Sequence, residues 1–254
     1  MRTMTSGIVM LTMLLMLGGY SVGTAAAQPG AKAGAMTVAE LERAGDQARA
    51  EKDYALAIQY FKAALRQDRG NAVLYNKVGL SELQKGNVVA ARTYFEKALR
   101  QDSKFADAVN NIGAVEYMRK NYGSAVKSFK KAVALDETRA TYHVNLGAAW
   151  FSQKKLDRAI AEYTRALELD PNAFQQQSRT GIAAQIASPE ERAQYAYLLA
   201  KIYAKRGDLE NCLQCLRKAK EDGYRNLANV YKDEEFSQVR ENPRLQEVVP
   251  PTAK

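Results

Sequence analysis

Two cysteines three positions apart, Cys212 and Cys215, are the residues whose types and spacing come closest to a reactive centre. A C-x-x-C pair can carry out thiol–disulfide exchange or provide half of a metal site. The surrounding pattern predicts a helix interior, so the helix N-terminus that stabilises a reactive thiolate is missing here. We expect structural thiols packed as small hydrophobic groups; the alternatives are a disulfide between them and a thiol redox site.

No other residue pattern predicts catalysis. The single histidine, His143, has no cysteine or second histidine at metal-ligand spacing and shares its register with packing residues. The chain has no serine in a nucleophile elbow and no glycine-rich phosphate loop. We therefore predict a protein that is not an enzyme and that needs no metal or other cofactor.

The strongest regularity of the chain is a period of 34 residues that recurs four times. A repeat of this length predicts a solenoid, in which each unit packs on the next and offers a surface instead of a catalytic pocket. Small residues are expected where two helices approach closely, with aromatic side chains beside them. The repeated columns are Gly45, Gly79, Gly113 and Gly147; Ala57, Ala91, Ala125 and Ala159; Phe61, Phe95, Phe129 and Tyr163; Ala64, Ala98, Ala132 and Ala166; and Asp68, Asp102, Asp136 and Asp170.

Each unit contains two helical patterns separated by turn residues. In the first unit they predict helices from about Val38 to Ala50 and from about Tyr54 to Gln67. Thr37 and Glu40 form a capping box before the first of these helices. In the second unit, Asn71 and Asn87 are expected to be N-cap residues.

The order of glycine, an apolar residue after the turn, alanine, aromatic, alanine and aspartate resembles the tetratricopeptide repeat (TPR) over residues 38–171. The closing proline of the family appears only as Pro171. The resemblance implies an all-α, right-handed superhelical solenoid of antiparallel helix pairs. It also implies that the first helices line a concave groove that binds a protein or peptide. The apolar residues after the turns are Tyr54, Val88, Tyr122 and Leu156.

The register changes after Pro171. An irregular insert over 172–188 precedes a fifth, divergent TPR-like helix pair over 189–223, for which Ser188 and Pro189 provide the start signal. The tail over 224–254 resembles the capping segment of some bacterial repeat arrays, which covers the exposed end of the last unit. In the fifth pair the columns are continued by Ala200, Cys212, Leu216 and Ala219.

Asparagines on the predicted first helices resemble part of a ladder with which some TPR proteins hold an extended peptide. An amide side chain suits this role because it donates and accepts hydrogen bonds at once. Asn111 and Asn145 lie 34 residues apart, and Asn76 and Asn110 lie one residue earlier in the second and third units. The alternative is that these amides only satisfy neighbouring helices.

Apolar residues near the ends of the same helices are expected, by the resemblance, to face the groove. Such a strip could hold an apolar side chain of a peptide or an amphipathic helix. The alternative is that these residues pack against the next unit. They are Leu80, Leu83, Tyr117, Met118 and Phe151.

The N-terminal residues 1–27 have the order typical of a secretory signal peptide. Arg2 precedes a short apolar run, and small residues lead to a cleavage site after Ala27. An uncleaved anchor is the alternative, but the run of about ten strongly apolar residues is shorter than the roughly 20 that a spanning helix needs. We predict a periplasmic or secreted protein without stable membrane insertion, with a short linker over 28–37.

Removal of this segment leaves 36 basic and 28 acidic residues, a net charge of +8. A basic balance favours anionic partners, and export argues against nucleic acid. The leading hypothesis is a non-enzymatic interaction scaffold of the cell envelope that binds an extended peptide or a partner helix in its concave groove. The alternatives are a charge-driven binding module for an anionic polymer or membrane surface, and a thiol redox protein.

Overall fold

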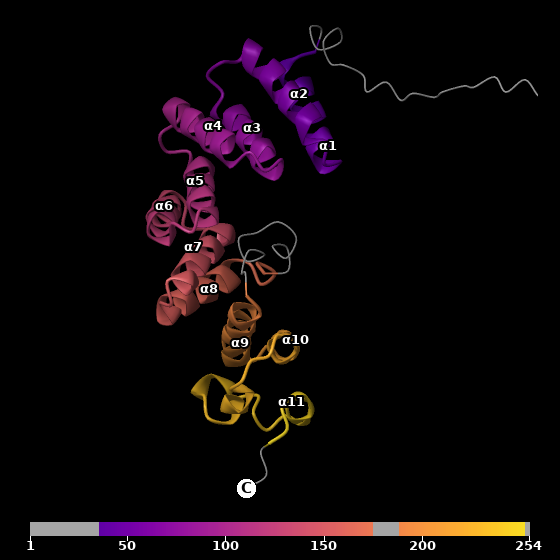
Figure 1. The fold of residues 1–254 in the computed structure, drawn as a ribbon, viewed down its shortest axis with the longest axis vertical. Helices are drawn as coiled ribbons and strands as arrows, with labels where there is room; N and C mark the ends of the chain where they lie inside the picture. The colour runs from indigo at the N-terminus through magenta and orange to yellow at the C-terminus, as the bar shows by residue number, and fades with distance from the viewer. Residues whose placement is uncertain (1–35, 175–187, 252–254) are drawn as a thin grey trace, which may run out of the picture.

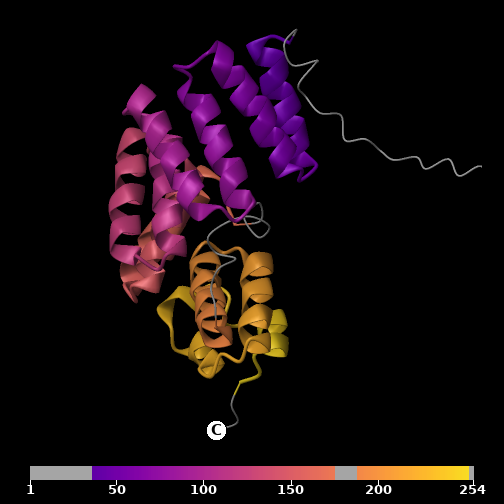
Figure 2. The same ribbon diagram turned by 45° about the horizontal axis from the view of Figure 1, so that its top comes forward.

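The computed structural model describes residues 36–174 and 188–251, and these form eleven α-helices and two short 3-10 helices without any strand. Consecutive helices pack against each other along the chain, and the units follow one another along a curved array (Figures 1 and 2). The predicted all-α solenoid is thereby confirmed. The predicted signal peptide, residues 28–35 of the linker and residues 175–187 of the insert lie outside the described residues.

Eight helices make up units one to four, two per unit. The first helices of neighbouring units approach each other, α3 with α5 and α5 with α7, which places them on the inner side of the curve. We call the side formed by α1, α3, α5 and α7 the inner face, and the side formed by α2, α4, α6 and α8 the outer face. The helices are α1 (Val38–Ala50), α2 (Tyr54–Gln67), α3 (Ala72–Gln84), α4 (Val88–Gln101), α5 (Ala106–Met118), α6 (Tyr122–Leu135), α7 (Ala140–Ser152) and α8 (Leu156–Leu169).

The predicted bounds of α1 and α2 and the three expected N-cap positions are confirmed. The Glu40 amide donates to the Thr37 hydroxyl at 3.3 Å, and the Thr37 amide donates to the Glu40 carboxylate at 2.8 Å. Asn71 accepts from the Leu74 amide at 3.1 Å. Asn87 is the N-cap residue of α4, but its side chain makes no cap bond; its amide nitrogen donates to the buried carboxylate of Glu82 at 2.8 Å. The expected position of this cap is therefore confirmed, without the side-chain bond.

Each glycine of the repeat lies directly against the aromatic ring of its own unit. A Cβ built on Gly113 would lie 2.6 Å from Cε1 of Phe129, and one on Gly147 would lie 2.5 Å from Cε1 of Tyr163. These rings are fully buried. Such distances are far below van der Waals contact, so a side chain at the glycine and a ring in this place exclude each other. The glycine column is thus required because the aromatic ring of each unit lies in contact with the helix backbone at that position.

Unit five consists of α9 (Pro189–Lys205) and α10 (Leu209–Glu221). The Ser188 hydroxyl accepts from the Glu191 amide at 3.1 Å, which confirms Ser188 as the N-cap. Ala200 and Leu216 replace the glycine and the ring, and both are fully buried. The smaller leucine leaves room for a Cβ on the opposite helix.

An aromatic side chain joins unit five to unit four. The Tyr195 ring on α9 meets the rings of Phe151 and Tyr163 edge-on, with centroids 5.5 and 5.7 Å away. Edge-to-face contacts at this distance add to the apolar burial. Unit five therefore continues the stack even though the insert separates it from unit four in sequence.

The C-terminal segment packs on α9 and α10 (Figure 1). It contains η3 (Leu227–Tyr231), η4 (Glu234–Phe236) and α11 (Pro243–Val248). Val230, Phe236 and Leu245 are fully buried there. Lys201 of α9 bridges Asp233 and Glu235 at 3.3 and 3.1 Å. The C-terminal segment therefore buries apolar side chains against the last helix pair.

Candidate functional site

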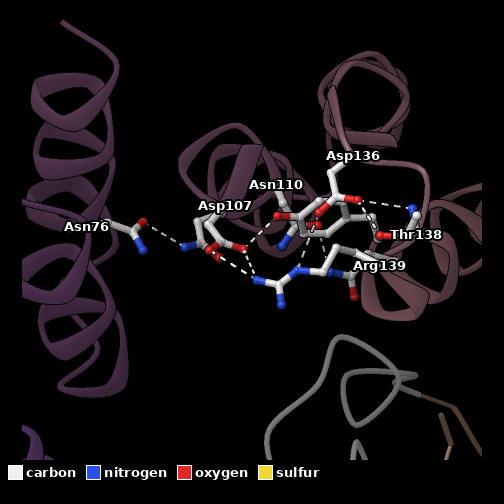
Figure 3. Close-up of polar contacts among 9 residues, drawn as sticks. Asn76, Asp107, Asn110, Asp136, Thr138 and Arg139 are labelled. Carbon is white, nitrogen blue, oxygen red and sulfur yellow. Dashed lines mark hydrogen bonds and ion pairs between the residues drawn. The ribbon is translucent and has the colours of Figure 1, made fainter. Parts of the chain in front are cut away.

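The four asparagines singled out in the sequence form two pairs on the inner face, and Figure 3 labels one member of each, Asn76 and Asn110. Nδ2 of Asn111 donates to Oδ1 of Asn76 at 2.9 Å, and Nδ2 of Asn145 donates to Oδ1 of Asn110 at 2.9 Å. Each bond joins one first helix to the next. The amides thus satisfy neighbouring helices, as the alternative interpretation held.

These pairs do not use the full hydrogen-bonding capacity of the amides. An asparagine side chain has two donor hydrogens and a carbonyl oxygen that can accept twice. Among the described residues, the Oδ1 atoms of Asn111 and Asn145 accept no hydrogen bond. Asn111 is the more accessible of these two, being half-buried where Asn145 is buried. The inner face therefore keeps some amide groups for an added partner.

A charged cluster lies beside the amides on α5 and at the start of α7 (Figure 3). The Asp107 carboxylate accepts from the Tyr142 hydroxyl at 2.6 Å and from Nη2 of Arg139 at 3.3 Å. Arg139 also faces Asp136 at 3.8 Å. Burial, followed by the bond to Asp107, raises the pKa of the Tyr142 hydroxyl, so this group remains a donor. The cluster fixes the junction of units three and four.

Sequence reasoning missed this cluster, although a spacing could have revealed it. Polar partners on neighbouring first helices lie 35 residues apart, one more than the repeat period. The pattern is visible in the sequence as pairs of polar residues at that separation. The pairs are Asn76 with Asn111, Asn110 with Asn145, Asp107 with Tyr142, and Tyr117 with Ser152.

Tyr117 and Phe151 are buried between units, with 5% and 2% of their surface exposed. The Tyr117 hydroxyl bonds to Oγ of Ser152 at 2.8 Å. Phe151 packs on Tyr195 of unit five. For these two residues the expectation of an open apolar strip is wrong, because the following unit covers their side chains.

The other three residues expected in the strip are only partly buried. Leu80 and Leu83 pack beside the cluster of Phe95 and Val115. Met118 lies at the end of α5 and lines a hollow against the start of α4. The apolar surface near the inner face is therefore smaller than the sequence indicated.

The cysteines and the histidine have packing positions. Cys212 is fully buried and Cys215 is half-buried, and both are free thiols. Burial, together with the nearby Asp208 carboxylate, raises the pKa of each thiol to about 12. At neutral pH they are therefore protonated and weakly nucleophilic. His143 is buried, with Nδ1 at 2.7 Å from the Glu162 carboxylate.

Within 36–174 and 188–251, no group of three or more histidine, cysteine, aspartate or glutamate side chains is arranged to hold a metal ion. Over the same residues, every helix is too short or too polar to cross a membrane.

Solved structures share the fold of this chain at low sequence identity. The structure of pilF from Pseudomonas aeruginosa is 20% identical, with a TM-score of 0.54 over 85% of this chain and 93% of that one. The thermophilic TPR protein TTC0263 from Thermus thermophilus is 19% identical, with a TM-score of 0.51 over 75% of this chain and 94% of that one. No curated protein matches the sequence.

Three family models described as tetratricopeptide repeat match the sequence. They cover residues 76–140, 140–173 and 193–221, which together amount to half of the chain. The last match falls on α9 and α10, the divergent pair beyond the insert. The chain therefore belongs to the tetratricopeptide repeat family.

Proposed function

We propose that this protein is a non-enzymatic interaction scaffold of the cell envelope that binds an extended peptide or a partner helix along its inner face. The observation that carries the proposal is the pair of amide bridges on three consecutive first helices, with acceptor groups left over. An extended peptide offers alternating N–H and C=O groups, which such amides can match whatever the peptide's sequence. The signal-like order of residues 1–27 supports the envelope location.

Replacing Asn111 and Asn145 by alanine tests the inner face. We expect the double variant to bind the partner about 30-fold more weakly, because two hydrogen bonds of about 1 kcal/mol each are removed. The partner is first captured from envelope extract with the chain from Gln28 onward and identified. Its affinity for both proteins is then measured by calorimetry.

The matched control replaces Asn87 and Asn211, two amides away from the inner face, by alanine. Thermal unfolding of each variant establishes that the solenoid persists. If the folded inner-face variant and the native protein bind the partner with equal affinity, the amides are not part of the binding site.

Charge on the outer face favours a second candidate function, attachment to an anionic surface. Helices α2, α4 and α6 carry eight basic residues and one acidic residue, Glu96. Among the described residues, only Arg92 of the eight forms an ion pair. Helix α8, in contrast, has two basic and three acidic residues, and its Arg165 pairs with Glu168 at 3.1 Å. The basic residues are Lys62, Arg66, Arg92, Lys97, Arg100, Lys127, Lys130 and Lys131.

Neutralising the lysines of α6 tests this second candidate. We expect Lys127→Gln, Lys130→Gln and Lys131→Gln together to weaken binding to phosphatidylglycerol vesicles on the order of a hundredfold, since each cation near an anionic surface contributes roughly 1 kcal/mol. Binding is measured by vesicle flotation at low and moderate salt, because salt screens such attraction. The control replaces Arg217, Arg225 and Lys232, which lie beyond the outer face, by glutamine. An equal loss in the control would show that net charge, and not this face, is responsible.

A further inference from the structure

An apolar hollow lies where the start of α4 meets the end of α5. Its volume is about 470 Å³. Val89, at its rim, is 83% exposed, the most exposed large hydrophobic side chain of the described residues. The hollow is lined by Val88, Val89, Arg92, Val115, Met118 and Arg119.

The hollow follows from two departures from the repeat pattern. Val88 is the smallest of the residues after the turns, where the neighbouring units have Tyr54 and Tyr122. One helical turn later, Arg92 stands in a column that is otherwise aliphatic, as at Ile58 and Val126. A tyrosine at position 88 would add a ring where the hollow now is. The site is therefore particular to the junction of units two and three and is not a general property of the fold.

The charges around the hollow are not all compensated. Arg92 binds the Glu96 carboxylate at 2.9 Å and also pairs with Glu116, whose side chain is only 7% exposed. Two carboxylates thus hold this guanidinium in place, and its charge is fully compensated within the protein. Arg119 is exposed, and within the described parts of the chain its side chain makes no ion pair or hydrogen bond. Of the described residues, Arg119 is therefore the cation at the rim that is free to pair with a partner's carboxylate.

We propose that this hollow docks an acidic partner segment, by taking one of its apolar side chains while an adjacent carboxylate meets Arg119. The apolar lining favours an apolar side chain of the partner, because its burial in the hollow removes apolar surface from water. The uncompensated guanidinium accounts for the acid, since a planar, always charged group suits a carboxylate. The hollow lies apart from the asparagine pairs, so its test can fail without affecting the proposed function.

The experiment titrates the full chain with the peptide acetyl-Asp-Leu-Phe-Asp-amide, followed by NMR of the labelled protein. Val88→Tyr fills the hollow with the residue that units one and three already hold, so the variant is compatible with the repeat. We expect it to bind the peptide at least tenfold more weakly than the native chain. The matched control, Leu156→Tyr, makes the same kind of change in unit four and is expected to leave binding unchanged.

Two further titrations identify the occupant. Arg119→Gln is expected to weaken binding of the acidic peptide about fivefold, because the peptide's carboxylate loses its guanidinium partner. Binding of acetyl-Asn-Leu-Phe-Asn-amide, which has no carboxylate, is expected to stay unchanged. Equal binding of the acidic peptide to the native and Val88→Tyr proteins would overturn the site. If octanoate binds and the peptide does not, the occupant of the hollow is a small apolar acid, and the proposal of a protein segment is overturned.

Discussion

Phe129→Ala is expected to lower the free energy of unfolding by about 3 to 5 kcal/mol, the range for removing a large buried aromatic side chain. The Phe129 ring is fully buried and lies against the backbone at Gly113, so its loss leaves a cavity inside unit three. In a solenoid each unit packs mainly on its neighbours, so a defect in a central unit interrupts the stack on both sides.

Urea unfolding measures this effect with two probes. Far-UV circular dichroism reports all helices, and fluorescence of the single tryptophan, Trp150, reports unit four. The control is Val89→Ala, which removes an 83% exposed side chain and should change stability by less than about 0.5 kcal/mol. A loss below about 1 kcal/mol for Phe129→Ala would contradict the packing described for unit three.

Gly113→Ala is expected to destabilise the native chain and to be harmless once Phe129 is replaced by leucine. The added Cβ would lie 2.6 Å from the ring, and displacing the ring costs about 1 to 3 kcal/mol. Alanine stabilises a helix by roughly 1 kcal/mol relative to glycine, which offsets part of this cost. We therefore expect the free energy of unfolding to fall by up to about 2 kcal/mol. With Phe129→Leu the same Cβ has room, as Ala200 has beside Leu216.

A double-mutant cycle over these substitutions gives the coupling free energy between positions 113 and 129. The stability of the native chain, the two single variants and the double variant is measured by urea unfolding. We expect Gly113→Ala to be destabilising with phenylalanine and neutral or stabilising with leucine at position 129. The same effect in both backgrounds would show that the ring does not set the glycine column.

The helices of units one to four could be predicted because sequence periodicity reports on packing inside each unit. The residues of a unit that contact each other recur at fixed positions, as Gly113 and Phe129 do, so the columns identify both the helices and the core. The caps at Thr37 and Asn71 are local and were also predictable. The position of the Asn87 cap was also predictable, but the bond of its side chain to the buried Glu82 carboxylate was not, because that bond depends on the preceding helix.

The candidate site was harder to predict, since it depends on contacts between units. Periodicity shows that Tyr117 and Phe151 are equivalent positions, but it does not show what the next unit places over them. Phe151 is covered by Tyr195, which follows an insert that breaks the period. The sequence left two interpretations of the amides open and did not show which asparagine pairs with which, because partners on neighbouring helices are offset from the repeat by one residue.

The 35-residue spacing of the amide partners gives the joint of units two and three and the joint of units three and four the same connector. Asn145 occupies in unit four the position that Asn111 occupies in unit three, and each finds its acceptor on the preceding first helix. The acceptors, Asn76 and Asn110, are likewise one period apart. A unit such as the third, which has an acceptor for the following unit and a donor for the preceding one, could therefore be duplicated with its connector intact. At the joint of units one and two the equivalent position is Lys77, which pairs with Glu42 at 2.7 Å, so the row of amides begins at unit two.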